Sequence, residues 1–356
     1  MRRLAIVTFS MLGLILAVAP GLATEQKGIG WQSGTLAQAL AQAKASGRWV
    51  LVDVYATWCG PCHAMDEQVW SREDVAHALD EAHGGPYLPL RRDGESGEGI
   101  EVARRYHVVG YPTLLVLDGS GAEIDRVMGF VEPKELVATL AAFRAGKGTL
   151  VELERSLKAT PNGAARDALL FEVGSRHAMR GDSRAVAELT EVAKQDSKRA
   201  APALLTLGKY YYLRGQKDYP SAIATLRELE RRFPSSEEAG EAPYDLGAAF
   251  HALGKDSEAR AVLDRWIAAA PKDGERYNAY AWLSYKSGFD RPRGIEVASA
   301  GLKMDPKNDS LWDTLAELYA ATGKPAQARE AAARALALKP GDHYYQAQLR
   351  RFGGAR

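Results

Sequence analysis

The cysteine content constrains this chain more than any other feature of its sequence. Only two cysteines occur among its 356 residues, Cys59 and Cys62, and the dipeptide Gly60-Pro61 separates them. A secreted scaffold held together by disulfides shows several cysteines at wide spacing. A pair this close can close only a very small loop, so its disulfide would add little loop-closure stabilisation. The pair is therefore predicted to serve reactivity rather than stability.

The first 23 residues differ from the rest of the chain. Two arginines precede an apolar run from Leu4 to Val18, and small residues follow up to Ala23. This order is typical of a secretory signal peptide. We therefore expect residues 1–23 to be a signal peptide and the mature protein to be exported to the periplasm. A retained segment that tethers the protein to the membrane is the alternative, although the apolar run is short for a bilayer span.

The length of the chain exceeds the size at which one hydrophobic core usually stops growing, so we expect two folding units after the signal peptide. The first is predicted over residues 24–148. Helix-like and strand-like segments alternate in it, which is typical of a mixed sheet with helices on both faces. Strands are expected at 49–55, 87–90, 113–117 and 124–128, and helices at 35–45, 63–82 with a break near Ser71, and 132–143.

The cysteine pair lies where the first predicted strand meets a helix. A thiol in the first turn of a helix is close to unpaired backbone N–H groups and to the positive end of the helix dipole, and both lower its pKa. Cys59 is expected in this position. Cys62, one turn further along, can attack a mixed disulfide on Cys59 and release the bound partner. Pro61 is tolerated because the first turn does not need its missing N–H.

Asp53 lies in the apolar strand before the pair. Its neighbours Leu51, Val52 and Val54 are apolar, and burial of a carboxylate without a partner is costly. A functional reason for this carboxyl group is therefore expected.

Residues 52–62, with the sequence VDVYATWCGPC, resemble the active-site segment of thioredoxins, and residues 109–113, VGYPT, resemble their cis-proline loop. The resemblance extends over residues 32–143 and implies an α/β thioredoxin fold. It also implies the activity of a protein thiol–disulfide oxidoreductase. The redox group of such a protein is its own Cys59–Cys62 disulfide, so no further cofactor is expected.

Within this resemblance, Cys59 would be the exposed nucleophile and Cys62 the buried resolving thiol. Asp53 would be a buried carboxyl group that exchanges the proton of Cys62, because burial raises the pKa of a carboxyl group. The sequence departs from the family in two places. Pro89 stands where cytoplasmic thioredoxins have a lysine near this aspartate, and the polar insertion 94–99 is expected to lengthen the next loop.

The resemblance also implies where a substrate lies. Pro112 would be cis and pack against the disulfide, which leaves the backbone of Tyr111 free to pair with an extended substrate segment. Trp58, Gly60 and Pro61, next to the reactive thiol, are the other residues expected to contact the substrate.

The cysteine pair is also compatible in principle with a haem or zinc site. Residues 59–63 match CxxCH, the attachment signature of c-type haem, but a strand, Asp53 and a GYPT sequence accompany the pair here. Zinc would need further ligands, and the sequence has no second CxxC and no HxxxH spacing. We therefore expect no metal, while a purely structural disulfide stays open. His63 is expected to be a solvated helix residue, unless its ring faces the thiols and favours the thiolate.

The second unit is predicted over residues 149–356, where strand patterns vanish and the sequence repeats itself. Pro306 and Pro340 stand 34 residues apart, which is the period of tetratricopeptide repeats. The resemblance to this family implies an all-α solenoid of about four to five helical hairpins. A degenerate first hairpin is expected at 167–193 and a frayed tail from Arg350. The clearest repeat carries the family's small, large and terminating residues, Trp312, Leu315, Tyr319, Gly323, Ala328, Ala335 and Pro340.

Together these features predict an exported protein thiol–disulfide oxidoreductase that reduces or rearranges disulfides. Its partners would be client proteins with thiols or disulfides, an upstream thiol donor of electrons, membrane-bound or not, and a peptide or protein in the groove of the repeats. The formal net charge of +1 favours no nucleic-acid partner. The alternative is an interaction scaffold, in which the repeats carry the function and the redox domain is a sensor or a passenger.

Overall fold

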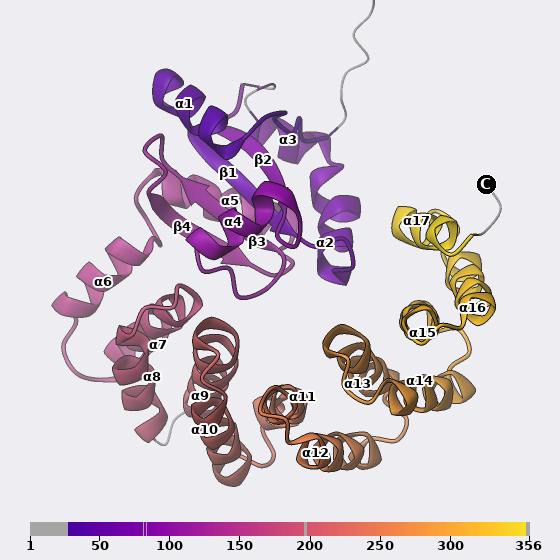
Figure 1. Cartoon of the computed structure of the whole chain (residues 1–356). Helices are drawn as coiled ribbons and strands as arrows, with labels where there is room; N and C mark the ends of the chain where they lie inside the picture. Colours follow the sequence, from indigo (N-terminus) through magenta and orange to yellow (C-terminus); the bar gives the residue numbers. More distant parts are fainter. Residues whose placement is uncertain (1–27, 81, 83, 196–197, 354–356) are drawn as a thin grey trace, which may run out of the picture.

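The computed structural model describes residues 28–80, 82, 84–195 and 198–353. The predicted signal peptide lies outside the described residues. The described chain forms a sheet covered by helices and, after it, an array of helices that curves back toward the sheet (Figure 1). Within the described ranges, no helix is both long enough and apolar enough to cross a bilayer.

The first unit is built around a four-stranded mixed sheet in the order β2-β1-β3-β4. Strand β1 pairs in parallel with β2 and antiparallel with β3, which pairs antiparallel with β4. All four predicted strands are present, and β2 continues past its predicted end at residue 90. Their bounds are Trp49–Tyr55 (β1), Tyr87–Asp93 (β2), Thr113–Leu117 (β3) and Glu123–Met128 (β4).

Helices cover both faces of this sheet. On one face, α1 (Leu36–Ser46) and α4 (Gly97–Arg105) pack against apolar residues of β1, β2 and β3. On the other face, α3 (Glu73–Leu79) and α5 (Pro133–Arg144) enclose a second apolar cluster with the opposite side of the same strands. The inner residues of β1 are buried as a result. The α/β thioredoxin fold predicted from the sequence is confirmed.

The helix expected over residues 63–82 is divided into three. Helix α2 (Gly60–Met65) continues into a π-helix, η1 (Asp66–Trp70), and the chain then turns before α3. Arg72 has extended backbone angles (φ −85°, ψ 132°), so it ends the helical run close to the predicted break.

The insertion 94–99 is only partly a loop, which corrects the prediction. Helix α4 begins inside it, at Gly97. The helix forms there because Val102 packs against the sheet and because Glu98, in its first turn, accepts the backbone N–H of Leu36 at 2.9 Å. A negative charge in the first turn also suits the helix dipole.

The second unit consists of helical hairpins, as predicted. In the described ranges, five hairpins lie between two single helices, α6 (Leu150–Ala159) and α17 (His343–Arg351). Arg351 pairs with Glu317, so the prediction of a frayed tail is wrong at the end of α17. The hairpins are α7 (Ala164–Met179) with α8 (Arg184–Lys194), α9 (Ala200–Leu205) and η3 (Thr206–Gln216) with α10 (Tyr219–Arg232), α11 (Glu237–Ala252) with α12 (Asp256–Ala269), α13 (Gly274–Ser287) with α14 (Arg291–Met304), and α15 (Asp309–Ala321) with α16 (Pro325–Leu338).

Glycines let the two helices of a hairpin approach closely. A Cβ atom at Gly208 would lie 2.8 Å from Leu226, and one at Gly247 would lie 2.8 Å from Leu263. Real Cβ atoms essentially never come closer than 3.0 Å to such neighbours, so a side chain at either glycine would push the second helix away. Close packing of each hairpin therefore explains the small residue at this position of the repeat.

The start of the array is fixed by one buried carboxylate, that of Asp125 in β4. One of its oxygens accepts a hydrogen bond from Arg180 at 2.6 Å, and the other accepts one from Arg176 at 2.5 Å. The second oxygen also accepts the backbone N–H of Leu150, at the start of α6, at 2.7 Å. Both oxygens thus bind the helical unit and set the direction in which it leaves the sheet.

Replacement of Asp125 by alanine should lower the free energy of unfolding by about 3 kcal/mol, because two largely buried arginines lose the buried carboxylate that both of them bind. They would keep their ion pairs with Glu172 and Glu123. Urea denaturation measures this loss. Glu172→Ala is the matched control. Glu172 also pairs with Arg176, at 3.1 Å, but is 48% exposed, and its removal should cost less than about 0.5 kcal/mol. Equal losses in the two variants would contradict the role assigned to Asp125.

Candidate active site

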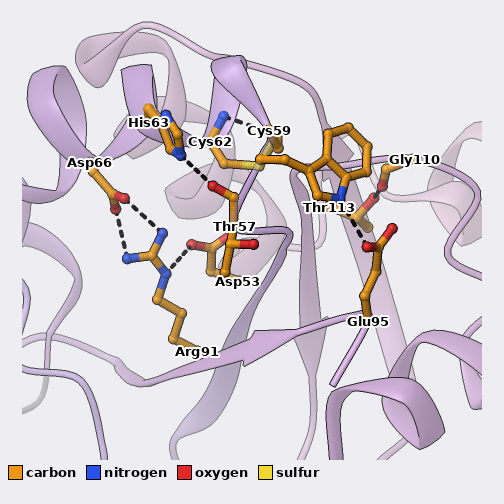
Figure 2. Close-up of a disulfide and its surroundings, with 11 residues drawn as sticks. Asp53, Thr57, Cys59, Cys62, His63, Asp66, Arg91, Glu95, Gly110 and Thr113 are labelled. Carbon is orange, nitrogen blue, oxygen red and sulfur yellow. Dashed lines mark hydrogen bonds and ion pairs between the residues drawn. A yellow bond between two sulfur atoms is a disulfide. The ribbon is translucent and has the colours of Figure 1, made fainter. Parts of the chain in front are cut away.

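The disulfide lies at the N-terminus of α2, directly after the loop that follows β1 (Figure 2). Cys59 is the N-cap residue, and its sulfur accepts a hydrogen bond from the backbone N–H of Cys62 at 3.1 Å. Pro61 lies in the first turn. The predicted position of Cys59 at a helix start is therefore confirmed. After reduction, this N–H and the helix dipole would both stabilise a thiolate on Cys59.

Both cysteines are buried, since only 3% of Cys59 and 1% of Cys62 are exposed. The resemblance to thioredoxins implied an exposed nucleophile, and for Cys59 this is wrong in the disulfide-bonded structure. Trp58 and Tyr111 pack against the pair, and the helical array faces it across a cavity. Access to Cys59 therefore runs through this cavity, between the two units.

The loop beside the disulfide has the expected backbone conformation. The Tyr111–Pro112 peptide bond is cis, as the resemblance implied. The hydroxyl group of Thr113 donates a hydrogen bond to the carbonyl of Gly110 at 2.7 Å, which closes the turn around this bond.

The predicted substrate-contact residues largely gather at one place. Trp58 meets the ring of Tyr111 edge-on, with 6.1 Å between centroids. Its indole N–H donates to Glu95 at 2.8 Å, which fixes the ring beside the disulfide. Trp58, Tyr111, Gly60 and Pro61 all line the cavity that reaches Cys59. Pro112, the fifth predicted residue, is buried and is not part of this lining.

Asp53 lies in the middle of β1 and is only 1% exposed. Figure 2 shows it beneath the disulfide, next to Arg91. Burial raises the pKa of Asp53 to about 7, while the nearby charge of Arg91 opposes the shift. A carboxyl group with such a pKa can take up and release a proton near neutral pH.

Arg91 is a site residue that sequence analysis missed. Its Nε lies 3.2 Å from Asp53, and its other two nitrogens bind both oxygens of Asp66 at 2.8 and 2.9 Å. The guanidinium group also stacks on Tyr55, 4.1 Å from the ring centroid. Arg91 is therefore held from three sides and presents one nitrogen to Asp53.

The position of Arg91 corrects the expectation for Pro89. Pro89 is paired with Leu51, whereas Arg91 is the residue opposite Asp53 in the parallel pair β1–β2. A positive charge is thus kept near the buried aspartate, on the same strand as the proline. Alignment of WVLVDVY with YLPLRRD in parallel register would have placed the first arginine beside the aspartate.

His63 is not the solvated helix residue that was expected. Its Nε2 lies 2.7 Å from the carbonyl oxygen of Thr57, and its ring lies 5.2 Å from that of Tyr344 in α17. The ring is half-buried between the loop and the helical array, so it is not a solvated side chain. Over the described residues, no group of three or more His, Cys, Asp or Glu side chains is arranged to hold a metal ion.

The far wall of the cavity comes from the helical array. Trp282 of α13, Asp313 of α15 and Tyr344 of α17 line it, opposite Cys59. None of the three was predicted as a site residue. The period of the repeats predicts hairpins, but what their concave side faces depends on the curvature of the whole array.

Comparison with known proteins agrees with both units. A thioredoxin-like family model matches residues 30–119, and a tetratricopeptide repeat model matches residues 213–283 and 292–351. The chain joins a thioredoxin-like domain to tetratricopeptide repeats.

The thioredoxin-like domain is similar to part of several thiol:disulfide interchange proteins. It is 39% identical over 92 residues to DsbD 2 of Pseudomonas aeruginosa, a match that covers 26% of this chain and 15% of the relative. It is 32% identical over 107 residues to DsbD of Escherichia coli K12, which covers 30% of this chain and 18% of the relative. The chain thus spans less than a fifth of these relatives. Among solved structures, a candidate disulphide-isomerase from Bacteroides thetaiotaomicron is 31% identical, covers 35% of this chain and 99% of its own, and has a TM-score of 0.30.

Asp53→Asn should stabilise the disulfide-bonded protein at high pH. Burial raises the pKa of Asp53 from 3.8 to about 7, so its contribution to stability is fully present below about pH 4 and is lost as the pH rises through 7. The variant should gain up to about 4 kcal/mol of unfolding free energy at pH 8 and little at pH 4. Denaturant titrations at the two pH values measure the gain.

The control for this pH dependence is Glu101→Gln, at a carboxyl group that is 65% exposed. It should change the unfolding free energy by less than about 0.5 kcal/mol at either pH. A gain for Asp53→Asn that does not grow with pH would rule out an elevated pKa of Asp53.

Proposed function

We propose that this protein is a thiol–disulfide oxidoreductase that exchanges its Cys59–Cys62 pair with the thiols or disulfides of client proteins. The observation that carries the proposal is the place of Cys59 at the start of α2, with the buried Asp53 beneath the pair. The similarity of the domain to thiol:disulfide interchange proteins supports it.

Reduction of a client would start from the dithiol form. The Cys59 thiolate attacks one sulfur of the client disulfide. A bond between Cys59 and the client forms as the client's own S–S bond breaks, and the departing client sulfur leaves with the electron pair as a thiolate. The backbone N–H groups at the start of α2 favour this reaction because they stabilise the Cys59 thiolate.

Cys62 would then resolve the mixed disulfide. Its thiol gives a proton to the carboxylate of Asp53, and the resulting thiolate attacks the sulfur of Cys59. The Cys59–Cys62 bond forms, the bond to the client breaks, and the second client sulfur leaves as a thiolate. Two electrons have then passed from the protein to the client. A pKa of about 7 suits Asp53 to this proton transfer.

Repeated reduction requires a donor that returns two electrons to the disulfide. We infer an upstream dithiol protein, in the membrane or outside the cytoplasm if residues 1–23 direct export. Rearrangement of client disulfides uses the same first step and needs no net supply of electrons. The repeats would bring the client or the donor to the redox domain.

The variant Cys62→Ser should trap a client. Reduced Cys62→Ser mixed with insulin should accumulate a covalent complex that dithiothreitol releases, because the second step is missing. Non-reducing electrophoresis and mass spectrometry detect the complex. Insulin turnover should fall by about a thousandfold or more in both this variant and Cys59→Ser.

Cys59→Ser is the matched control for trapping. It should form no such complex, since Cys62 is 1% exposed. A complex of equal yield in Cys59→Ser would contradict the assignment of Cys59 as the nucleophile.

Replacement of both cysteines by serine distinguishes the proposed oxidoreductase from an interaction scaffold. Loss of insulin reduction with retained partner binding is expected, whereas an unaltered cellular role would favour the scaffold.

A further inference from the structure

Three helices of the repeat array each turn one face toward the disulfide. Trp282 of α13, Asp313 of α15 and Tyr344 of α17 line a cavity of about 340 Å³ whose other wall carries Trp58 and Cys59. This volume is at the low end of the range for ligand pockets, so it suits a few side chains of a client. We therefore expect a client to present its cysteine on an extended segment that enters between the two units.

Two aromatic contacts hold this wall in place around the cavity. Trp282 packs on Trp58 with 5.4 Å between ring centroids, and Tyr344 packs on His63 with 5.2 Å between centroids. Trp58 and His63 flank the disulfide in the sequence. The repeats therefore contact the redox domain on both sides of the reactive pair.

Trp58 already binds a cation from within the chain. The Nζ atom of Lys286 lies 4.4 Å from the centroid of the Trp58 ring and 3.1 Å from Glu95. Cations are attracted to the faces of aromatic rings by the charge distribution of the π system. Trp282 and Tyr344, which also line the cavity, offer the same kind of surface to a cation that a client brings.

The cavity wall carries two acidic side chains. The lining found among the described residues includes the carboxyl groups of Glu275 and Asp313 and the imidazole of His63, but no lysine or arginine. Glu275 is exposed, whereas Asp313 is 9% exposed and accepts a hydrogen bond from Gln348. The nearby Arg351 forms its ion pair with Glu317.

Asp313 would gain from a cation beside it. Burial raises the pKa of Asp313 to about 8, and the neighbouring Glu317 adds to the shift. A bound ammonium or guanidinium group would favour the carboxylate form and make an ion pair with it. An acidic side chain of a client would instead be repelled by Glu275.

We propose that this cavity is a client subsite that selects an extended, cysteine-containing segment with a lysine or arginine next to the cysteine. The subsite rests on the proposed exchange reaction and names the segment that Cys59 attacks. The client sulfur would meet Cys59, and the cationic side chain would lie between the aromatic rings and the carboxyl group of Asp313.

The test uses the reduced full chain and short synthetic peptides, each with one cysteine joined to thionitrobenzoate as a mixed disulfide. The residue next to the cysteine is lysine, norleucine or glutamate. Attack of the Cys59 thiolate on the peptide sulfur forms the Cys59–peptide bond and releases coloured thionitrobenzoate with the electron pair. Stopped-flow absorbance therefore gives the rate constant. Division by the rate constant with mercaptoethanol corrects for the reactivity of each peptide.

The lysine peptide should react about fivefold faster than the norleucine peptide, and the glutamate peptide should be the slowest. Asp313→Asn and Glu275→Gln should each reduce the ratio of the lysine rate to the norleucine rate to about twofold or less. Glu275 is exposed, so its variant tests the subsite even if Asp313→Asn does not fold. Glu330→Gln, at an exposed carboxyl group of α16 outside the cavity, is the matched control and should keep the full preference.

Equal corrected rates for the three peptides would overturn the subsite and leave the exchange reaction standing. The same conclusion would follow from a lysine preference that persists in full in both acidic-residue variants. Hydroxyethyl disulfide is too small to need the subsite, so its reaction tests the exchange chemistry separately from the subsite. If the reduced protein does not react with it, the exchange reaction and the subsite fall together.

Discussion

The placement of the repeats depends on one carboxylate enclosed between the two units. One oxygen of Asp125 binds Arg176 of α7 and the start of α6, and the other binds Arg180 directly after α7, so these bonds orient the first hairpin on the sheet. In a solenoid, each hairpin packs only on its neighbours, and small rotations add up along the array. The direction at the first hairpin therefore decides where α13, α15 and α17 lie, which is opposite α2 (Figure 1).

At the redox centre, the protonation of Asp53 depends on the balance between its burial and the charge of Arg91, which Asp53 shares with Asp66. Full burial alone would strongly favour the neutral acid, whereas a dedicated ion pair would favour the carboxylate. Arg91 gives two nitrogens to Asp66 and turns only Nε toward Asp53. The compensation is therefore partial, and the pKa of about 7 follows from it. The same sharing would keep Arg91 paired when Asp53 becomes protonated, so proton transfer need not leave an isolated buried charge.

The structural features predicted correctly from the sequence are those that neighbouring residues determine. The β-branched run at 49–55, the helix start at Cys59 and the hairpin period are encoded in neighbouring residues, and the structure confirms all three. Arg91 was missed because its meeting with Asp53 depends on the register between two strands, and the start of α4 was missed because distant contacts stabilise it. The residues of the cavity wall were the hardest to predict. They are brought close to Cys59 by the curvature of the whole array of hairpins, and no short stretch of sequence encodes that curvature.

If the repeats bind a ligand on their concave face and the disulfide exchanges with clients as proposed, the two processes would compete for one volume. The concave face of a solenoid is its usual binding surface, and here a part of that face is the wall opposite Cys59. A client that enters the cavity of about 340 Å³ must displace any other occupant, and a non-reactive occupant would shield the sulfur pair from every other disulfide. Only 3% of Cys59 is exposed, so access to its sulfur limits which disulfides can react with it. In the proposed reaction, selection of clients would therefore fall to the residues that line the cavity, and most of those outside the redox motif belong to the repeats.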